Sequence, residues 1–182
     1  PEARQHIQAA LKIEPSSAEA YSALGLYHTY HSDFIEAENA YRTALSLNPA
    51  LVSAQHNLGF SYWMQNQFGL ARQHFESALA LNPLAPMSNF ALADTLYSEG
   101  FVDEAFSQYE HCLAVIADFP ACLLGLSGLQ LITGNEQQAK VLLEKSAKIL
   151  GENNPYVVGS RGRAETFPSP RDRTRISMPS SA

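Results

Sequence analysis

This sequence is poor in cysteine, in cations and in long apolar runs. Two cysteines in 182 residues give no disulfide framework of the kind that holds small secreted domains together. No apolar run approaches the roughly 20 residues of a membrane-spanning helix, and the N-terminus lacks a signal-peptide pattern. We therefore predict no membrane span in this stretch of chain.

The few cations are unevenly distributed along the chain. Up to Val158 the sequence has seven Lys and Arg against sixteen Asp and Glu, and after it five Arg against one Glu and one Asp. Binding to nucleic acid needs clustered cations that neutralise phosphates. The acidic region, which contains the repeats described next, is therefore not expected to bind nucleic acid.

What the sequence does have is a period of 34 residues, which appears in three separate registers. The first register contains Leu24, Leu58, Leu92 and Leu126. The second contains Ala3, Ala37, Ala71, Ala105 and Ala139, and the third Ile7, Tyr41, Phe75, Tyr109 and Leu143. Three registers with one interval indicate a repeat protein, in which each repeat packs mainly against its neighbours.

Each period reads as two helices joined by a short break. In residues 18–51 apolar residues three or four apart mark one helical face before the break at 31–33 and another face after it. A break this short makes the two helices antiparallel neighbours. The small residues Gly25 and Ala37 stand where the helices approach closely, and Tyr41 fills the space beside them.

The two cysteines are predicted to be buried free thiols. Cys112 continues the 34-residue spacing of Ala10, Ala44 and Ala78, which is typical of a packed position, and Cys122 lies in the next predicted helix. A disulfide is the alternative, and an oxidising compartment would favour it. The sequence leaves the compartment open between the cytoplasm, which we favour, and the bacterial periplasm.

These spacings resemble the tetratricopeptide repeat. They are Tyr21-x-x-Leu24-Gly25-x-x-His28 with Ala37-x-x-x-Tyr41 and Pro49, and Leu58-Gly59-x-x-Tyr62 with Ala71-x-x-x-Phe75 and Pro83. The resemblance covers about residues 1–150. It implies an all-α fold, a right-handed superhelix (α-solenoid) of antiparallel helix pairs, whose concave groove is lined by the first helix of each pair.

We predict that the repeat array spans residues 1–158. It comprises the second helix of a truncated repeat (1–17), three clear repeats (18–51, 52–85 and 86–119) and a degenerate fourth repeat (120–153). Residues 159–182 contain five arginines and few apolar side chains, too few to offset the entropy lost on ordering. We predict that they form a disordered basic tail.

No motif for catalysis, a cofactor or a metal is recognisable. His28 and His31 lie three apart on one predicted helix face and could form half of a metal site, but no Cys or second His pair has a matching offset for zinc. We interpret them as packing residues. No nucleophile has a recognisable base nearby, and no glycine-rich phosphate loop occurs. We predict a protein that is not an enzyme and binds no cofactor or metal.

The predicted functional surface is the concave groove. The residues expected to line it lie on the inner faces of the first helices: Tyr30, His56, Asn57, Phe60, Trp63, Met64, Asp94, Tyr97 and Leu131. Exposed Trp, Tyr and Met side chains mark binding surfaces, and the repeat pattern does not require large aromatics at Trp63 and Tyr97. Chaperone-binding members of the family grip a C-terminal carboxylate with Lys, Arg and Asn, of which only Asn57 is found here. That function is not expected.

We predict an interaction scaffold that binds a peptide or partner helix with aliphatic residues in this groove. A second resemblance supplies an alternative, because Leu84-Ala85-Pro86 and Leu96-Tyr97-x-x-Gly100 look like the repeats attached to bacterial winged-helix (ToxR-like and CadC-like) activators. The chain would then be a sensing or oligomerisation module of a larger regulator whose DNA-binding or catalytic domain lies upstream. Homo-oligomers could also form through the exposed ends of the repeat array.

Overall fold

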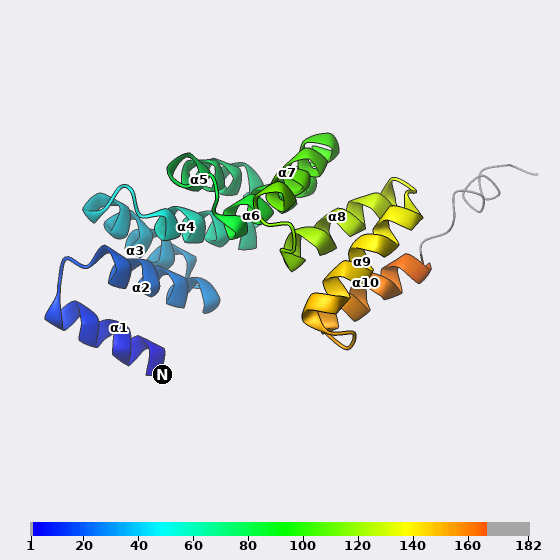
Figure 1. The fold of residues 1–182 in the computed structure, drawn as a ribbon. Helices are drawn as coiled ribbons and strands as arrows, with labels where there is room; N and C mark the ends of the chain where they lie inside the picture. Colours follow the sequence, from blue (N-terminus) through cyan, green and yellow to red (C-terminus); the bar gives the residue numbers. More distant parts are fainter. Residues whose placement is uncertain (1, 167–182) are drawn as a thin grey trace, which may run out of the picture. The chain divides into compact units, whose positions relative to one another are not determined.

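The computed structural model describes residues 2–166, and the regular structure in that range is entirely helical (Figure 1). The helices there are α1 (Glu2–Ile13), α2 (Ala18–Tyr30), α3 (Phe34–Leu47), α4 (Val52–Met64), α5 (Phe68–Leu81), α6 (Pro86–Glu99), α7 (Val102–Val115), α8 (Pro120–Ile132), α9 (Glu136–Leu150) and α10 (Pro155–Thr166). The predicted all-α architecture is confirmed. Among the described residues, no helix is long and apolar enough to cross a lipid bilayer.

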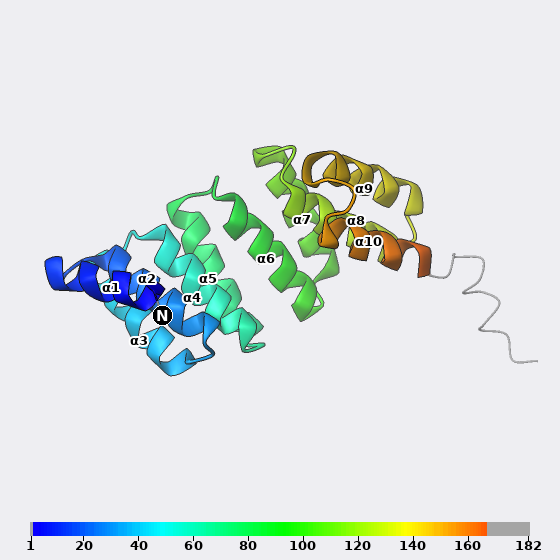
Figure 2. The same ribbon diagram turned by 90° about the horizontal axis from the view of Figure 1, so that it is seen from below.

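The chain folds as two compact units, with the boundary inside α7, between Ala105 and Phe106. The sequence predicts one continuous array, so this division is a difference from the prediction. In the first unit α2 packs on α3 and α4 packs on α5, while α4 also lies beside α2 and α6. In the second unit α8 packs on α9, and α10 packs on both of them (Figure 2). We call α2, α4 and α6 the A helices, and α3 and α5 the B helices, of the first unit.

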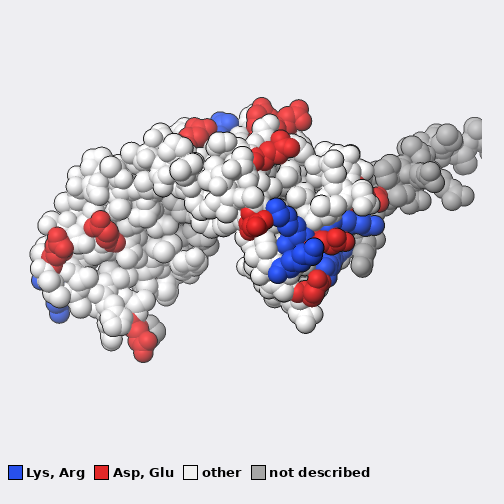
Figure 3. Space-filling model, viewed as in Figure 1, with Lys and Arg blue, Asp and Glu red and all other residues white. Residues whose placement is uncertain are grey.

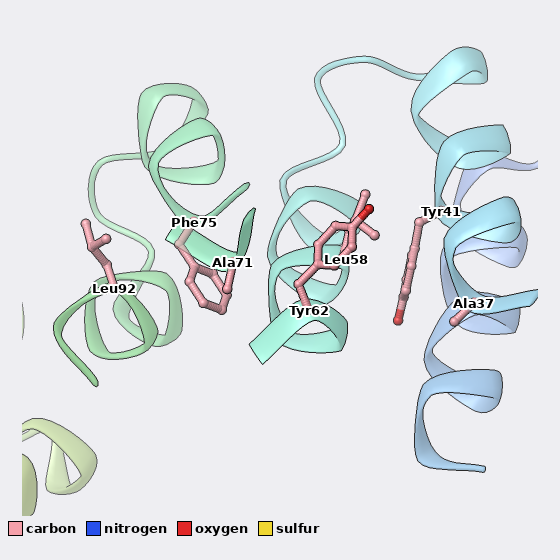
Figure 4. Close-up of a cluster of buried hydrophobic side chains, with 7 residues drawn as sticks. All are labelled: Ala37, Tyr41, Leu58, Tyr62, Ala71, Phe75 and Leu92. Atoms are coloured by element: carbon pink, nitrogen blue, oxygen red, sulfur yellow. The ribbon is translucent and has the colours of Figure 1, made fainter. Parts of the chain in front are cut away.

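The core of the first unit is built from aromatic rings packed on glycines. Tyr41 and Phe75, on the two B helices, are 0% and 1% exposed and belong to one cluster with residues of α4 and α6 (Figure 4). A Cβ atom on Gly25 would lie 2.6 Å from Cε1 of Tyr41, and one on Gly59 would lie 2.9 Å from Cδ1 of Phe75. Protein interiors are close-packed, so there is no room for a side chain at either glycine. The glycine and aromatic registers of the sequence therefore mark a direct contact.

The buried Tyr41 hydroxyl has a partner within the same helix pair. Thr29 Oγ1 donates to the Gly25 carbonyl at 2.9 Å and lies 3.1 Å from the Tyr41 hydroxyl, which therefore donates to Thr29. Burial raises the pKa of Tyr41 above its ordinary range, so the phenol stays protonated. A polar group inside the core is thus satisfied without water.

The turn inside each helix pair has one conformation that repeats along the chain. A residue with positive φ recurs at a fixed interval: Ser32 (62°), Asn66 (58°), Gly100 (89°) and Gly134 (86°). The next residue closes the turn by donating its N–H to a carbonyl five positions earlier, as Asp33 does to His28 at 3.0 Å. This is a Schellman-type helix end, which favours glycine because glycine adopts positive φ without steric cost.

Cys112 and Cys122 form a disulfide between α7 and α8 of the second unit, so the prediction of two free thiols is wrong. Both are 0% exposed, as predicted. Their Cα atoms are 6.4 Å apart, within the range that a disulfide spans. The residues at the same repeat positions of the first unit are small and buried too: Ala44 with Ala54, and Ala78 with Ser88. The sequence register therefore predicts where the two helices approach closely, but it does not show which side chains point across that contact.

Helix α10 continues past residue 159, which corrects the predicted start of the disordered tail. Val157 is 0% exposed, and Arg161 forms an ion pair with Glu152. Packing on α8 and α9 therefore orders a segment whose composition alone predicts disorder. The rest of the predicted tail, 167–182, lies outside the described residues.

Candidate functional site

Three aromatic side chains form a continuous patch on the A helices of the first unit. The ring centroid of Tyr30, at the end of α2, lies 6.1 Å from that of Phe60 on α4. Phe60 in turn stacks on Trp63, one helical turn further along, with centroids 6.3 Å apart and ring planes 10° from parallel. Tyr30 is 67% exposed, whereas Phe60 and Trp63 are half-buried against the core cluster. We call Tyr30, Phe60 and Trp63 the aromatic patch.

Two further predicted residues expose apolar side chains on the same helices. Met64 follows Trp63 in α4 and is 37% exposed, and Tyr97 on α6 is 40% exposed. Tyr97 occupies the position of Trp63 in the next repeat, and α6 lies beside α4. Both side chains are therefore accessible to a partner that contacts the A helices.

Trp63 is held by packing rather than by a hydrogen bond. Its ring packs against the core cluster, and its Nε1 is buried without a hydrogen-bond partner in the protein. A buried N–H without a partner costs free energy. Stability alone would therefore favour an aromatic residue without a polar atom at this position.

His56 belongs to the packing between helices rather than to an open surface. Its Nδ1 lies 3.1 Å from Oγ of Ser88 on α6, and its ring centroid lies 5.4 Å from that of Phe75 on α5. Burial lowers the pKa of His56, so the imidazole is neutral near pH 7. This residue, predicted to line the groove, instead joins α4 to its two neighbours.

The remaining predicted groove residues differ in accessibility. Asn57 on α4 and Asp94 on α6 are half-buried. Leu131 lies in the second unit and is only 4% exposed, so it cannot present its side chain to a partner, and its assignment to the binding surface is corrected. The physical reason is that α8, which carries Leu131, is packed against both α9 and α10.

A polar pocket on the B-helix side is not predicted by the sequence. Its cavity of about 350 Å³ is lined by Arg42, Leu45, Ser46, Leu58 and His74. Nδ1 of His74 lies 2.9 Å from Oε1 of Gln55, and Arg42 pairs with Glu38 at 2.7 Å. Burial, and secondly the charge of Arg42, lowers the pKa of His74. These residues come from three helices at unrelated repeat positions, so no spacing in the sequence could have brought them together.

Comparison with known families decides what kind of repeat this is. Two sequence profiles of the tetratricopeptide repeat match the chain, one over residues 18–51 and the other over residues 52–85. Residues 18–85 of this chain are two tetratricopeptide repeats. The resemblance seen in the sequence is thereby confirmed. A comparison with curated proteins finds no match.

Solved structures share the fold of this chain. The structure of pilF from Pseudomonas aeruginosa matches with a TM-score of 0.75 at 21% identity, over 99% of this chain and 86% of that chain. A thermophilic TPR protein from Thermus thermophilus matches with 0.72 at 18% identity, over 88% and 86%. An O-GlcNAc transferase from Thermobaculum terrenum matches with 0.63 at 22% identity, over 73% of this chain and 27% of that one. At these identities the likeness is one of fold.

The two histidines considered as half of a metal site have other partners in this chain. Nδ1 of His28 lies 3.3 Å from Oδ2 of Asp33. His31 places its Nδ1 2.8 Å from the Tyr27 carbonyl and stacks on the Tyr27 ring, with centroids 4.1 Å apart. Within the part of the chain that the structure describes, no group of three or more His, Cys, Asp or Glu is placed to hold a metal ion.

Proposed function

We propose that the chain is a protein-interaction scaffold that binds a peptide or a partner helix on the A helices of the first unit. The observation that carries this proposal is the aromatic patch, a run of rings in mutual contact that reaches the solvent. Helical repeat arrays provide extended surfaces of this kind for binding. Tyr and Trp combine a large apolar area with a polar group at the rim, which suits them to interfaces.

Two features of the aromatic patch are unfavourable for folding alone. Tyr30 leaves 67% of its surface exposed, so it gains little from hydrophobic burial. Trp63 buries an indole N–H that has no partner, at a cost in stability. The exposure of Tyr30 supports a role in binding, because a partner that covers this ring supplies the missing burial. The residue types support it as well, because Trp and Tyr are enriched at the residues that dominate interface energies.

Calorimetry with the intact chain and a partner isolated with it tests the proposal. Tyr30→Ala and Trp63→Ala are each expected to weaken binding by about 2 kcal/mol, the typical loss at an interface hot spot. Ile35→Ala on α3 is the matched control, because Ile35 is 76% exposed but lies on a B helix. This variant should bind the partner with wild-type affinity. Far-UV circular dichroism checks that each variant is folded. Wild-type affinity in both patch variants would sink the proposal.

We propose a binding role and not a catalytic one. The O-GlcNAc transferase shares its helical fold with this chain over 27% of its own length, and this likeness transfers no activity. In the polar pocket, Arg42 is already paired with Glu38, and His74 with Gln55. These contacts within the protein support a structural role for the pocket.

A second candidate function, self-association through α1, is favoured by the exposure of that helix. Helix α1 packs on α2 and has no buried residue. Ala3 and Ala10 are exposed, whereas Ala37 and Ala44, at the same repeat positions of α3, are 0% exposed. A helix of a second copy would cover this face. Light scattering is then expected to show a molar mass that rises with concentration in the wild type, and the mass of a monomer at every concentration in Ile7→Glu. A wild-type mass that stays that of a monomer at every concentration would exclude this function.

A further inference from the structure

We propose that the segment bound on the aromatic patch is basic, with apolar anchor residues flanked by Lys or Arg. This inference rests on the proposed function, whose binding surface it uses, and it adds the charge of the partner. Three properties of the first unit support it: the charges on the A helices, the exposed aromatic rings and the net charge of the unit.

The A helices of the first unit contain no Lys or Arg. The charged residues of α2, α4 and α6 are all acidic: Glu19, Asp94 and Glu99. Glu99 is paired with Arg72 of α5 at 3.4 Å, and α4, which carries most of the aromatic patch, has no charged residue. An acidic segment that docks here loses the hydration of its carboxylates and gains no opposite charge on these helices, which is costly. The surface therefore selects against acidic partners.

The aromatic rings offer cations a favourable contact. The first unit already contains one such contact, in which Cζ of Arg72 lies 5.3 Å from the ring centroid of Phe101. Tyr30 and Tyr97 expose 67% and 40% of their surfaces, so a Lys or Arg of a partner can reach their rings. A cation is attracted by the negative face of an aromatic ring, whereas a carboxylate is repelled by it. Flanking cations would thus add to the binding of apolar anchors.

The first unit as a whole also attracts cations. Residues 1–105 contain four Lys and Arg against eleven Asp and Glu, a net charge of −7. Figure 3 shows scattered Asp and Glu on the first unit, whereas Lys and Arg cluster beside acidic residues on the second. A charge of this size accelerates the approach of a basic ligand and slows that of an acidic one. Contact and long-range electrostatics therefore favour the same class of partner.

Selection of random displayed peptides on the intact chain tests the inference. The selected sequences are expected to carry apolar anchors beside Lys or Arg, and to be depleted in Asp and Glu. Replacing the selected Lys and Arg by Gln should weaken binding roughly tenfold, from the loss of two or three cation–π or ion-pair contacts. Replacing them by Glu should abolish it. Added salt should weaken the basic peptide more than its Gln version, because salt screens charge.

A cation introduced on the A helices provides a matched pair of variants. Ala23 is exposed on α2, and Ala23→Lys should weaken the basic peptide and improve the Glu version. Ser46 is exposed on the B helix α3, and Ser46→Lys adds the same charge on the other set of helices. Its effect on either peptide should be much smaller. Equal effects of the two substitutions would mean that net charge alone, and not the A-helix surface, discriminates between the peptides.

The outcomes separate this inference from the proposed function. Selected peptides that are uncharged or acidic, and that lose binding to Tyr30→Ala, would overturn the basic partner and leave the scaffold function intact. Selected peptides that bind Tyr30→Ala and Trp63→Ala as tightly as the wild type would overturn both. A selection that yields no binding peptide would also overturn both.

Discussion

The two units of this chain close their helix pairs in different ways. In the first unit a glycine faces an aromatic ring, as Gly59 faces Phe75. In the α8–α9 pair of the second unit, the same repeat positions hold Ser127 and Leu143, both buried, and a disulfide joins α7 to α8. Between α7 and α8, where the disulfide lies, a glycine still faces a ring, because a Cβ on Gly125 would collide with Tyr109. The glycine–aromatic contact is thus absent inside the α8–α9 pair but present between α8 and the helix before it.

The units also differ in what they offer to solvent. The second unit has exposed ion pairs, such as Lys145 with Asp118 at 2.8 Å and Arg161 with Glu152. The first unit exposes aromatic rings on helices that carry no cation. Exposed ion pairs and exposed rings occur in both units, since Arg42 pairs with Glu38 in the first and Tyr156 is 74% exposed in the second. The feature that directs the binding proposal to the first unit is its run of aromatic rings in mutual contact.

Removal of the disulfide is expected to have the largest effect on stability, and to act on the second unit alone. Reduction, or the double variant Cys112→Ala with Cys122→Ser, should lower the free energy of unfolding of the second unit by about 3 kcal/mol, as expected for a loop of this size. The new residues match the buried pair Ala78 and Ser88 of the first unit.

The single tryptophan makes the two units distinguishable in this experiment. Trp63 fluorescence reports only the first unit, while circular dichroism reports both. In urea, the dichroism transition should move to lower concentration without a change in the fluorescence midpoint. Equal shifts of both signals would show that the units unfold together and would contradict the comparison.

A methyl group at Gly59 is the next largest expected effect, and it acts on the first unit. In Gly59→Ala the new Cβ meets the Phe75 ring and lies 3.1 Å from the Ala71 carbonyl, so the helices must separate. We expect a loss of about 2 kcal/mol in urea unfolding. Gly128→Ala on α8 is the control, because nothing lies within 4 Å of its Cβ. It should be neutral or stabilise by up to about 1 kcal/mol, and a similar loss in both variants would refute the steric explanation.

The turns inside the helix pairs provide a smaller test. Ser32 adopts a φ of 62°, whereas the second unit has Gly134 at the same turn position. Ser32→Gly should therefore stabilise the first unit by about 0.5 kcal/mol, since relief of steric strain exceeds the entropy cost of glycine. Gly134→Ser should destabilise the second unit. Thermal unfolding midpoints of the two variants should move in opposite directions, and a shift in the same direction would count against the strain argument.

Acid should weaken the first unit gradually through its buried histidines. Burial lowers the pKa of both His56 and His74 in the folded chain. The unfolded chain then binds protons more readily, so stability is complete above about pH 6.5 and falls as pH drops below it. Urea midpoints from Trp63 fluorescence across this range check the slope. The double variant His56→Asn with His74→Asn should flatten it, and an unchanged slope would assign the effect to other groups.

Much of the fold could be predicted from the sequence, because the repeat registers reflect contacts between neighbouring helices. Gly59 and Phe75 recur with the period since each ring occupies the space that a glycine leaves. The disulfide and the burial of Leu131 could not be predicted in this way. The disulfide depends on which side chains point across a helix contact. The burial of Leu131 depends on α10, which packs on α8 and whose own composition does not predict a helix.

The candidate site was predictable only where a residue departs from the repeat pattern. Trp63 and Tyr97 are distinguishable in the sequence because the repeat pattern does not require large aromatics there, and the structure exposes both in part. His56 was misjudged because its partners, Ser88 and Phe75, come from two other helices. A helix pattern gives the face on which a residue lies, but not how much of that face the neighbouring helices cover.

The turn at Ser32 recurs at Asn66 with the same sign of φ and the same closing hydrogen bond, so each repeat of the first unit reverses its own direction. A tandem duplication of residues 18–51, inserted after Leu51, would therefore add one helix pair whose contacts all have counterparts in the present chain. An insertion of another length inside a helix would rotate the rest of that helix's apolar face away from its neighbour, by about 100° per residue. We therefore expect this chain to tolerate growth or shortening in whole repeats.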